Sequence, residues 1–372
     1  MIKVGITGQK GFVGSHLYNT LGLNPEEYER VDFHKEYFDN DADLDLFVQQ
    51  CDVIVHLAAM NRHPDPEIIY NNNVALVKKL VTSLERTKSK AHVLFSSSSQ
   101  EEKDNLYGQS KKEGRKLLAE WAQNNNGVFS GLVIPNVFGP FGLPNYNSFI
   151  ATFCYKLSHS ETPAIDVDGD VKLIYVGELV QEIINQIKLR KTIEEYIVPH
   201  TISTKVSEVL AKLVDYKKLY FDGGEIPKLI SNFDYQLFNT FRCYFDIASH
   251  YPVKFTQHTD PRGAFVEIIR LGIGGQCSFS ITVPGITRGN HFHTRKIERF
   301  AVIKGKALIQ LRKIDSDEVL DFYLDGNEPA FVDMPIWYTH NIKNIGEEEL
   351  YTIFWINEPY DPTDADTYFA NV

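Results

Sequence analysis

Cysteine and long apolar runs are what this sequence has least of. Its four cysteines lie far apart among 372 residues and form no Cys-x-x-Cys pair; they are Cys51, Cys154, Cys243 and Cys277. This spacing argues against a disulfide framework and against a cysteine-bound metal. No apolar run approaches the roughly 20 residues that a membrane helix needs, and the first residues lack the order typical of a secretory signal. We therefore expect a protein of the reducing cytoplasm with no membrane insertion.

An excess of positive charge is absent too. Lysine and arginine number 38 against 49 aspartates and glutamates, which gives a formal net charge of −11. This balance argues against nucleic acid or an anionic membrane as the main partner, although it leaves room for a local basic pocket that holds a diphosphate. We expect a small anionic ligand.

Two patterns of short apolar runs divide the chain. From Met1 to about Ile134 the runs alternate with helical stretches, which predicts a parallel sheet with helices on both faces. After about Thr240 to Pro252, short β-rich runs follow one another with glycine and proline between them, as in an antiparallel barrel or jelly roll. The sequence therefore predicts a Rossmann-type doubly wound α/β domain over residues 1–245 and an all-β domain over residues 246–372.

A glycine-rich turn follows the first apolar run. "TGQKGFVGS" sets Gly8, Gly11 and Gly14 directly after Ile2 to Thr7 and at the start of a helix. Glycines there permit a tight turn and close approach of a pyrophosphate, whose charge a helix N-terminus stabilises. The spacing differs from the usual G-x-G-x-x-G, and glycine also serves βα turns that bind nothing.

A tyrosine and a lysine four residues apart follow a later buried run. Tyr107 and Lys111 come after "LFSSSS", and residues at i and i+4 share one face of a helix. The ammonium group would favour the ionised phenol and lower its pKa from about 10, which arms a proton donor. The alternative is a solvated helix face, but a strand's carboxyl end is where open α/β sheets bind ligands.

The front half resembles the extended short-chain dehydrogenases/reductases that act on nucleotide sugars. The stretches that carry the resemblance are "TGQKGFVG", "VIVHLAA", "YNNNVAL", "FSSSS", "YGQSK" and "IPNVFGPFG". The resemblance implies that Tyr107 is the acid/base, that Lys111 orients it and the nicotinamide ribose, and that Ser98, or alternatively Ser97, polarises the substrate oxygen. It also implies that Asn136 contacts substrate. The cofactor-binding residues that it implies are Gly8, Gly11, Phe12, Val13, His34, Lys35, Leu57, Ala58, Ala59, Asn73, Tyr107 and Lys111.

The choice between NADH and NADPH depends on the stretch "VDFHKEY". An acidic residue at the end of the second strand, here Asp32, usually binds the ribose 2′-hydroxyl of NAD. His34 and Lys35 could instead meet the 2′-phosphate of NADPH, which is the cofactor that we expect. The alternative is that Lys35 is an ordinary solvated lysine.

A cluster of metal-binding residue types lies in the back half. His291 and His293 share one face of a strand because side chains alternate with period two, and Glu298 can rejoin them from the next strand. With His340 from a later strand they would form a nitrogen and oxygen set suited to zinc, iron, manganese or nickel. The alternative is a set of ordinary polar residues on a barrel face.

The pattern G-x5-H-x-H-x4-E-x6-G from Gly285 to Gly305 resembles the first cupin motif, and the stretch around His340 resembles the second. Trp337 stands where that second motif usually has glycine. The resemblance implies an all-β cupin (jelly-roll) domain in the back half. It implies a divalent ion, of which zinc is our choice, bound by His291, His293, Glu298 and His340.

A narrower resemblance concerns "DPRGAFVEIIR" and "ITRGNHFHT", which are similar to the cupin-fold epimerases of deoxyhexulose nucleotides. It implies that the nucleotide diphosphate contacts Arg262, Phe265, Glu267 and Arg288. His291 and Lys296 fall near the epimerase's base and its neighbouring lysine. A metal-bound imidazole cannot also take a proton, so a metal-bound water or another residue would act in its place. Lys296 is the catalytic residue of this domain that the resemblance implies.

The order of the two domains resembles the bifunctional enzymes of capsular polysaccharide synthesis. It implies that a homodimer acts on a UDP-linked 4-keto-deoxysugar. The cupin would invert C3 of UDP-2-acetamido-2,6-dideoxy-L-arabino-4-hexulose, and the reductase would reduce C4 with NADP(H) to UDP-2-acetamido-2,6-dideoxy-L-talose, a precursor of N-acetyl-L-fucosamine. One alternative is a reductase with a structural or dimerising cupin, and another is a sensor without turnover.

The cofactor hypothesis predicts that Lys35→Ala raises KM for NADPH much more than for NADH. Lys35 would contact only the 2′-phosphate, and a charge-assisted hydrogen bond contributes about 1.5–3 kcal/mol. Steady-state kinetics with both cofactors provide the measurement. Equal changes for the two cofactors would remove Lys35 from this role.

Overall fold

The computed structural model describes residues 1–261 and 263–372, so Arg262 lies outside the described residues. The chain forms two compact units. The first contains residues 1–152 and 166–206, and the second contains residues 153–165 and 207–372. The domain boundary that we predict after residue 245 falls inside the second unit and stays a prediction.

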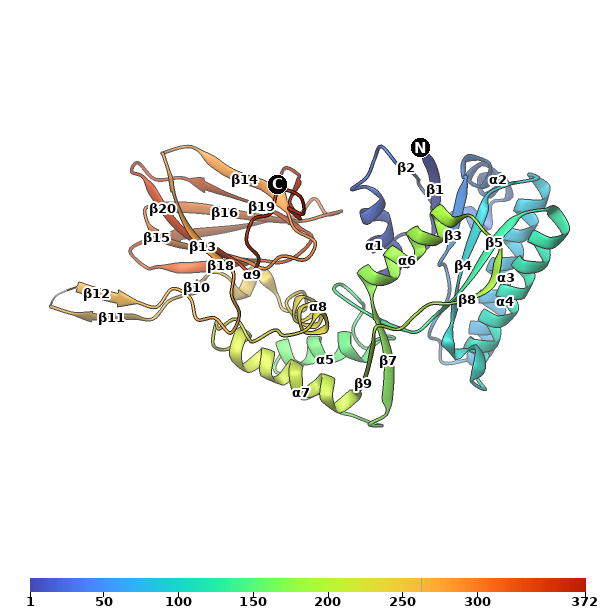
Figure 1. The fold of residues 1–372 in the computed structure, drawn as a ribbon, viewed down its shortest axis with the longest axis horizontal. Helices are drawn as coiled ribbons and strands as arrows, with labels where there is room; N and C mark the ends of the chain where they lie inside the picture. The colour runs from blue at the N-terminus through green and yellow to red at the C-terminus, as the bar shows by residue number, and fades with distance from the viewer. Residues whose placement is uncertain (262) are drawn as a thin grey trace. The chain divides into compact units, whose positions relative to one another are not determined.

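The first unit is built on a six-stranded sheet with the order β2-β1-β3-β4-β5-β8, all of whose neighbours are parallel (Figure 1). The chain leaves β1 toward β2 on one side and continues from β3 on the other, which confirms the predicted doubly wound, Rossmann-type sheet. The strands are β1 (Ile2–Thr7), β2 (Tyr28–Val31), β3 (Val53–His56), β4 (His92–Ser98), β5 (Val128–Ile134) and β8 (Ile193–Ile197).

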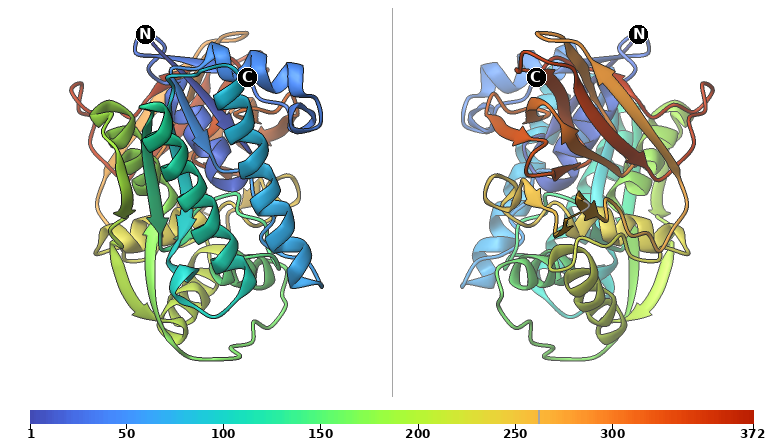
Figure 2. Two further views of the ribbon diagram at one scale, coloured as in Figure 1. Left: turned by 90° about the vertical axis from the view of Figure 1, so that its right-hand side faces the viewer. Right: turned by 90° about the vertical axis from the view of Figure 1, so that its left-hand side faces the viewer.

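Helices cover both faces of this sheet. Figure 2 shows α3 and α4 side by side over one face, where they enclose one apolar cluster with α2, whereas α1 and α6 enclose the other. All four residues of β3 are buried, as expected for a central strand of a sheet covered on both faces. The helices are α1 (Phe12–Leu21), α2 (Asp41–Gln50), α3 (Pro66–Arg86), α4 (Leu106–Asn125) and α6 (Val176–Leu189), with the 3₁₀ turns η1 (Lys35–Asp39) and η2 (Ser99–Glu102).

Polar residues set the start of the helices that matter for the site. Asn105 caps α4 by accepting a hydrogen bond from the Gly108 amide at 2.7 Å, and Asp65 caps α3 by accepting one from the Glu67 amide at 2.9 Å.

A small sheet completes the unit, with β6 parallel to β7 and β7 antiparallel to β9. Its strands are β6 (Asn136–Phe138), β7 (Asp170–Tyr175) and β9 (Ile202–Lys205), and α5 (Phe149–Ser158) runs from the first unit's residues into the second's.

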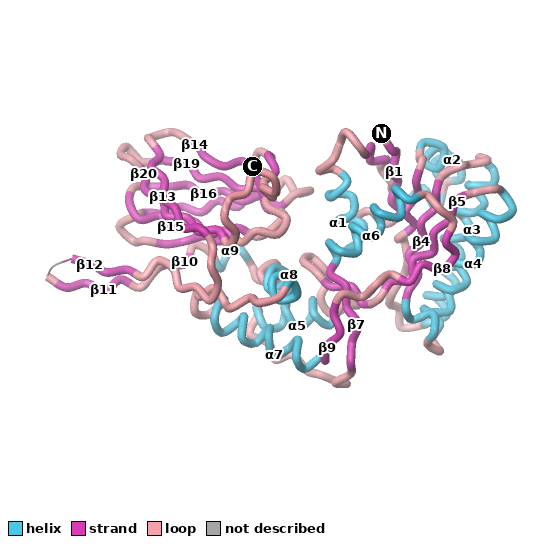
Figure 3. Tube along the Cα trace, viewed as in Figure 1, coloured by secondary structure: helices cyan, strands magenta, loops and turns pink. Residues whose placement is uncertain are grey.

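The second unit contains two five-stranded antiparallel sheets, which Figure 3 shows as magenta strands joined by loops. One has the order β10-β18-β15-β20-β13 and the other the order β17-β16-β19-β14-β21. The all-β jelly-roll prediction for the back half is confirmed. The strands are β10 (Val253–Lys254), β13 (Gln276–Thr282), β14 (Thr287–Phe292), β15 (Glu298–Lys304), β16 (Lys306–Lys313), β17 (Val319–Asp325), β18 (Ala330–Met334), β19 (Tyr338–Asn344), β20 (Leu350–Ile356) and β21 (Tyr368–Phe369).

A hairpin of β11 (Gln257–Asp260) and β12 (Gly263–Val266) projects from these sheets (Figure 1). Helical segments precede the sheets in the same unit: α7 (Val206–Tyr216), the π-helical turn η3 (Lys217–Phe221), α8 (Asn232–Phe241) and α9 (Ile247–His250). Within the described ranges, no helix is long and apolar enough to cross a bilayer.

A buried ion network joins these helices to the sheet. Arg299 on β15 binds Asp333 on β18 through two hydrogen bonds, at 2.7 and 2.9 Å, and both side chains are almost fully buried. The Tyr220 hydroxyl donates to Asp333 at 2.7 Å and accepts from Arg242, at the end of α8, at 3.1 Å. Every charge in this cluster therefore has a partner of opposite sign or a hydrogen bond.

We predict that Asp333→Ala destabilises the second unit by about 3–5 kcal/mol, because it leaves the Arg299 guanidinium buried without its counter-charge. Denaturant unfolding followed by a signal from this unit measures the loss. Glu328→Gln is the matched control, because the Glu328 ion pair with Lys254 is exposed and such pairs contribute at most about 1 kcal/mol. Equal effects of the two substitutions would contradict the network's role.

Candidate functional site

The glycine turn of the first unit forms a cradle at the sheet's topological switch point. Gly8 has a φ of 79°, and a side chain on it would lie 3.0 Å from the Ala58 amide nitrogen. A side chain on Gly14 would lie 2.2 Å from the Gly8 carbonyl oxygen, so only glycine fits there. The Gly11 amide closes the turn on the Gly8 carbonyl at 2.9 Å. The turn therefore brings the backbone of β1, α1 and the segment after β3 together, as a dinucleotide requires.

The other predicted cofactor residues lie around this turn. Phe12 and Val13 form the first turn of α1, and Leu57 to Ala59 follow β3. Asn73 is buried on α3, where its amide accepts from the Met60 amide at 2.7 Å and donates to Ser110 on α4 at 3.1 Å. Asn73 thus holds the segment after β3 against two helices.

The residues that should select the cofactor follow β2. The Asp32 carboxylate accepts a hydrogen bond from the Tyr18 hydroxyl at 2.8 Å. The Lys35 side chain is 92% exposed and lies 3.9 Å from Glu36, while the His34 ring contacts Tyr37. Lys35 is thus accessible to a phosphate, and its assignment to NADPH stays a prediction.

Tyr107 and Lys111 share one face of α4, as the spacing predicts. The Lys111 nitrogen lies 6.0 Å from the centre of the Tyr107 ring and donates to the Ser96 hydroxyl at 3.3 Å. Contrary to our expectation, the pKa of Tyr107 is not lowered: burial raises it to about 12, and burial lowers the pKa of Lys111 to about 8. The desolvation of both groups outweighs their attraction, because the ammonium is directed at Ser96 and the Phe95 ring.

The serine run alternates between two environments. Ser97 is buried and donates to Glu101, which is held by Arg115 through bonds of 3.0 and 2.8 Å. Ser98 lies on the opposite side of β4 because side chains alternate along a strand, and its hydroxyl accepts from the Gln100 amide at 3.2 Å. The Ser97 hydroxyl thus donates to the Glu101–Arg115 ion pair, whereas the Ser98 hydroxyl donates to none of the residues that the structure describes.

The short connection from Ser98 to Tyr107 is held in place by residues that the sequence did not lead us to expect. A side chain on Gly108 would lie 2.0 Å from the Gln100 carbonyl, so glycine lets this connection fold onto the start of α4. The buried ion pair of Glu101 and Arg115 also holds this connection in place. The only sign of these contacts in the sequence is that the segment from Ser98 to Tyr107 is unusually short.

Asn136, on β6, lines a small cavity with Asn147, Phe149 and Leu173.

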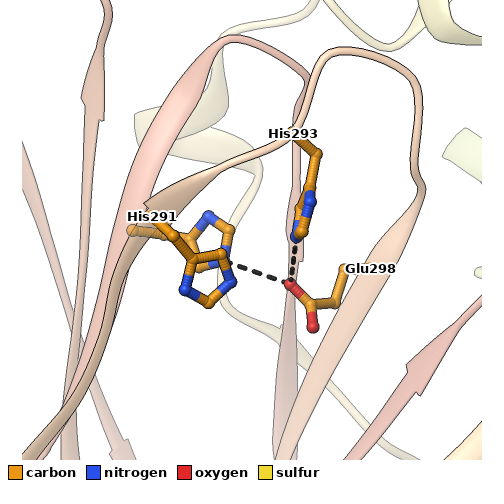
Figure 4. A group of neighbouring side chains, drawn as sticks. His291, His293 and Glu298 are labelled. Carbon is orange, nitrogen blue, oxygen red and sulfur yellow. Dashed lines mark hydrogen bonds and ion pairs between the residues drawn. The ribbon is translucent and has the colours of Figure 1, made fainter. Parts of the chain in front are cut away.

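The second unit brings the four predicted metal ligands together. His291 on β14 lies opposite His340 on β19 in the strand register, and Glu298 begins β15 in the facing sheet. Figure 4 shows His291 and His293 turned toward Glu298, and the four ligand atoms lie within 4.8 Å of one another. Glu298 Oε2 lies 3.2 Å from His293 Nε2 and 3.1 Å from His340 Nε2.

Backbone contacts fix which nitrogen each imidazole presents. His293 Nδ1 lies 2.6 Å from the Asp366 carbonyl and His340 Nδ1 lies 3.2 Å from the Tyr338 carbonyl. A carbonyl only accepts, so both Nδ1 atoms carry hydrogen and both Nε2 atoms face Glu298. His340 Nε2 is buried, and its contact with Glu298 Oε2 at 3.1 Å lacks the alignment of a hydrogen bond. Burial lowers the pKa of His291 to about 4, so this imidazole is neutral at pH 7. Three imidazole nitrogens and a carboxylate oxygen are the donor types that a divalent transition ion prefers.

Trp337 accommodates the turn at which the usual glycine is missing. Its φ is 63°, in the left-handed region that glycine favours, and its amide donates to the His293 carbonyl at 2.8 Å. The indole stacks on Phe292 with ring centres 5.6 Å apart. These contacts hold a conformation that a non-glycine residue rarely adopts.

Three of the four predicted diphosphate-binding residues fall within the described residues of the second unit. Arg288, on β14, donates to the Thr282 hydroxyl at 3.0 Å, and Phe265 lies on β12. Glu267 pairs with Arg270 at 2.7 Å and lines a cavity of about 320 Å³ with Phe331 and Arg299. Lys296 is buried, and its Nζ donates to the Ala365 carbonyl at 2.8 Å. These assignments stay predictions.

Comparison with known proteins defines the class. Residues 4–188 match the NAD dependent epimerase/dehydratase family, and residues 258–368 match the polysaccharide biosynthesis C-terminal domain. The chain is an NAD(P)-type oxidoreductase joined to a polysaccharide-biosynthesis domain.

Two relatives span the whole chain. UDP-2-acetamido-2,6-beta-L-arabino-hexul-4-ose reductase of Pseudomonas aeruginosa is 30% identical over 378 residues, 100% of this chain and 99% of that protein. The crystal structure of the capsular polysaccharide assembling protein CapF of Staphylococcus aureus is 35% identical, covers 100% of both chains and has a TM-score of 0.63. The spore coat polysaccharide biosynthesis protein SpsL of Bacillus subtilis matches 30% of this chain at 27% identity. The chain belongs to the family of two-domain capsular polysaccharide enzymes.

Proposed function

We propose that this chain is a bifunctional nucleotide-sugar enzyme that inverts C3 of a UDP-linked 4-ketohexose and then reduces C4. The observation that carries the proposal is the presence, in separate units of one chain, of a tyrosine–lysine pair beside a dinucleotide turn and of a three-histidine, one-glutamate cluster. The full-length relative named as a reductase of UDP-2-acetamido-2,6-beta-L-arabino-hexul-4-ose supports the substrate. We take the substrate to be the corresponding UDP-2-acetamido-2,6-dideoxy-L-arabino-4-hexulose and the product to be UDP-2-acetamido-2,6-dideoxy-L-talose, for capsule synthesis.

The reduction uses the residues of the first unit. NADPH, when bound, supplies the hydride that reaches C4, and Lys35 and His34 are the residues that would distinguish its 2′-phosphate. Tyr107 donates the proton that the C4 oxygen needs, and its raised pKa keeps the phenol protonated until then. Ser98 donates a hydrogen bond to the same oxygen, since Ser97 is engaged by Glu101. Lys111 holds the ribose and balances the charge that Tyr107 develops.

The epimerisation uses the second unit. A proton on carbon beside a ketone is acidic, because its removal gives an enolate. Zinc, when bound by His291, His293, Glu298 and His340, supplies positive charge that stabilises developing negative charge on an oxygen. Lys296 is the residue that we assign to the proton transfer. The C3 proton leaves from one face of the sugar, and a proton from solvent returns to the opposite face of the enolate, which inverts the centre. Lys296 must exchange its hydrogen bond with the Ala365 carbonyl for one with the substrate.

A homodimer is supported by an apolar surface on the second unit. On the edge strand β13 and the turn after it, Phe279 is 68% exposed and Val283 54%, with Ile281 and Ile286 also exposed. Such a surface at a sheet edge is a site for association. Light scattering on the purified chain should give the mass of two chains.

The alternative is a reductase whose cupin is structural. It is favoured by the burial of His293, Glu298 and His340 and by the fixed hydrogen bonds of the two histidines, which suit an ion that stabilises the fold. The two hypotheses differ in whether loss of the ion stops exchange at C3.

Tyr107→Phe tests the reductase. It should lower the rate of NADPH oxidation by about 10²–10⁴-fold, the usual contribution of a general acid, and leave deuterium exchange of the substrate intact. The measurements are cofactor absorbance and NMR in D₂O. Tyr70→Phe, elsewhere in the first unit, is the control. Reduction by Tyr107→Phe at the wild-type rate would refute the assignment.

His340→Ala tests the metal's role. The substitution should lower metal content and stop exchange of the C3 proton with D₂O, while reduction of a sugar that already carries the inverted centre continues. Elemental analysis, NMR and a melting curve provide the measurements, because loss of a ligand can also destabilise the fold. A folded, metal-free variant that exchanges C3 at the normal rate would leave the ion a structural role.

A further inference from the structure

The C-terminal segment, residues 361–372, runs along the edge of the histidine cluster. Its strand β21 pairs with β14, so that Phe369 lies opposite His291 and Tyr368 opposite Phe292. On the other side of Asp366, the Asp364 carboxylate binds the Arg295 guanidinium at 2.8 Å. The segment is thus anchored on both sides of Asp366.

Asp366 is buried, and its carboxylate binds three consecutive main-chain amides of the loop between β14 and β15. Oδ1 accepts from the Thr294 amide at 3.1 Å and from the Thr294 hydroxyl at 2.6 Å. Oδ2 accepts from the amides of Arg295 and Lys296, each at 3.0 Å. Four hydrogen bonds offset the cost of burying a carboxylate, and they fix the conformation of the loop.

The same residue sets the orientation of a metal ligand. Its main-chain carbonyl accepts the His293 Nδ1 hydrogen at 2.6 Å, so Nε2 is the nitrogen directed at Glu298. The carboxylate fixes the loop that begins one residue after His293, and the carbonyl fixes the imidazole itself. Two independent contacts from one residue therefore define the position and the tautomer of this ligand.

We infer that Asp366 is a positioning residue for the divalent ion, acting through His293, and that the C-terminal segment is part of the metal centre. This inference rests on the metal assignment in the proposed function. Hydrogen bonds of this kind orient a ligand and raise its basicity, and their loss usually costs 10- to 100-fold in metal affinity.

The test is the affinity of the full-length chain for Zn²⁺, measured by competition with a chromophoric chelator. Asp366→Asn keeps the size of the side chain but turns an amide donor toward the loop amides, and it should weaken binding by about 10–100-fold. Asp364→Asn makes the same chemical change two residues away, where the carboxylate pairs with the half-exposed Arg295, and it should change the affinity less than about 3-fold. Thr294→Val removes one hydrogen bond and should have a smaller effect in the same direction as Asp366→Asn.

Two spectroscopic measurements do not depend on catalysis. The visible spectrum of the Co²⁺-loaded Asp366→Asn variant should differ from that of the wild type. NMR of ¹⁵N-histidine in the Zn²⁺-loaded wild type should show His293 bound through Nε2 with hydrogen on Nδ1. This second measurement still decides the matter if Asp366→Asn does not fold.

Coordination through Nδ1, or wild-type affinity and spectrum in a folded Asp366→Asn variant, would overturn the inference. A wild-type chain that binds no divalent ion would overturn the metal assignment itself. Tight binding that Asp366→Asn leaves unchanged would overturn only the role of Asp366.

Discussion

The buried pair of Arg299 and Asp333 is the interaction on which the second unit depends. It joins β15 to β18 in one sheet, and Tyr220 and Arg242 extend it to the helical segments. Side chains alternate along β15, so Arg299 enters this network while its neighbour Glu298 faces the histidines. The pair that anchors the strand on one side therefore fixes the Glu298 carboxylate on the other, and the Asp366 carbonyl binds His293 from the C-terminal segment.

Burial governs the chemistry of both sites. In the first unit burial raises the pKa of Tyr107 and lowers the pKa of Lys111. The phenol is therefore protonated before the reaction, and desolvation disfavours the charged form of the lysine. In the second unit it leaves His291 neutral and able to bind a cation. A bound dinucleotide or ion would supply the charge that each protein site lacks, as the two proposed reactions require.

The sequence predicts local patterns well and their connections poorly. Apolar runs that alternate with helical stretches suffice to predict the parallel sheet, and successive short β-rich runs predict the all-β region. Period-two alternation and the spacing of the histidine motif predict that His291, His293, Glu298 and His340 gather. The sequence does not predict that Arg115 pairs with Glu101, that Asp366 binds the loop after His293 some 70 residues earlier, or that Lys296 donates to the Ala365 carbonyl. Hydrophobic periodicity describes single helices and strands and does not report contacts between these segments. The pKa of Tyr107 was misjudged because spacing reports proximity to Lys111 but not the burial of both groups.

The central claim is that two reactions on one sugar reside in separate units of this chain. It is tested most directly by NMR of the purified protein with UDP-2-acetamido-2,6-dideoxy-L-arabino-4-hexulose in D₂O, with and without NADPH. We predict that without NADPH deuterium enters at C3 and no reduced sugar forms, and that with NADPH the product is reduced at C4 and carries deuterium at C3. Reduction of the sugar with hydrogen retained at C3 would contradict the account and leave the chain a reductase alone.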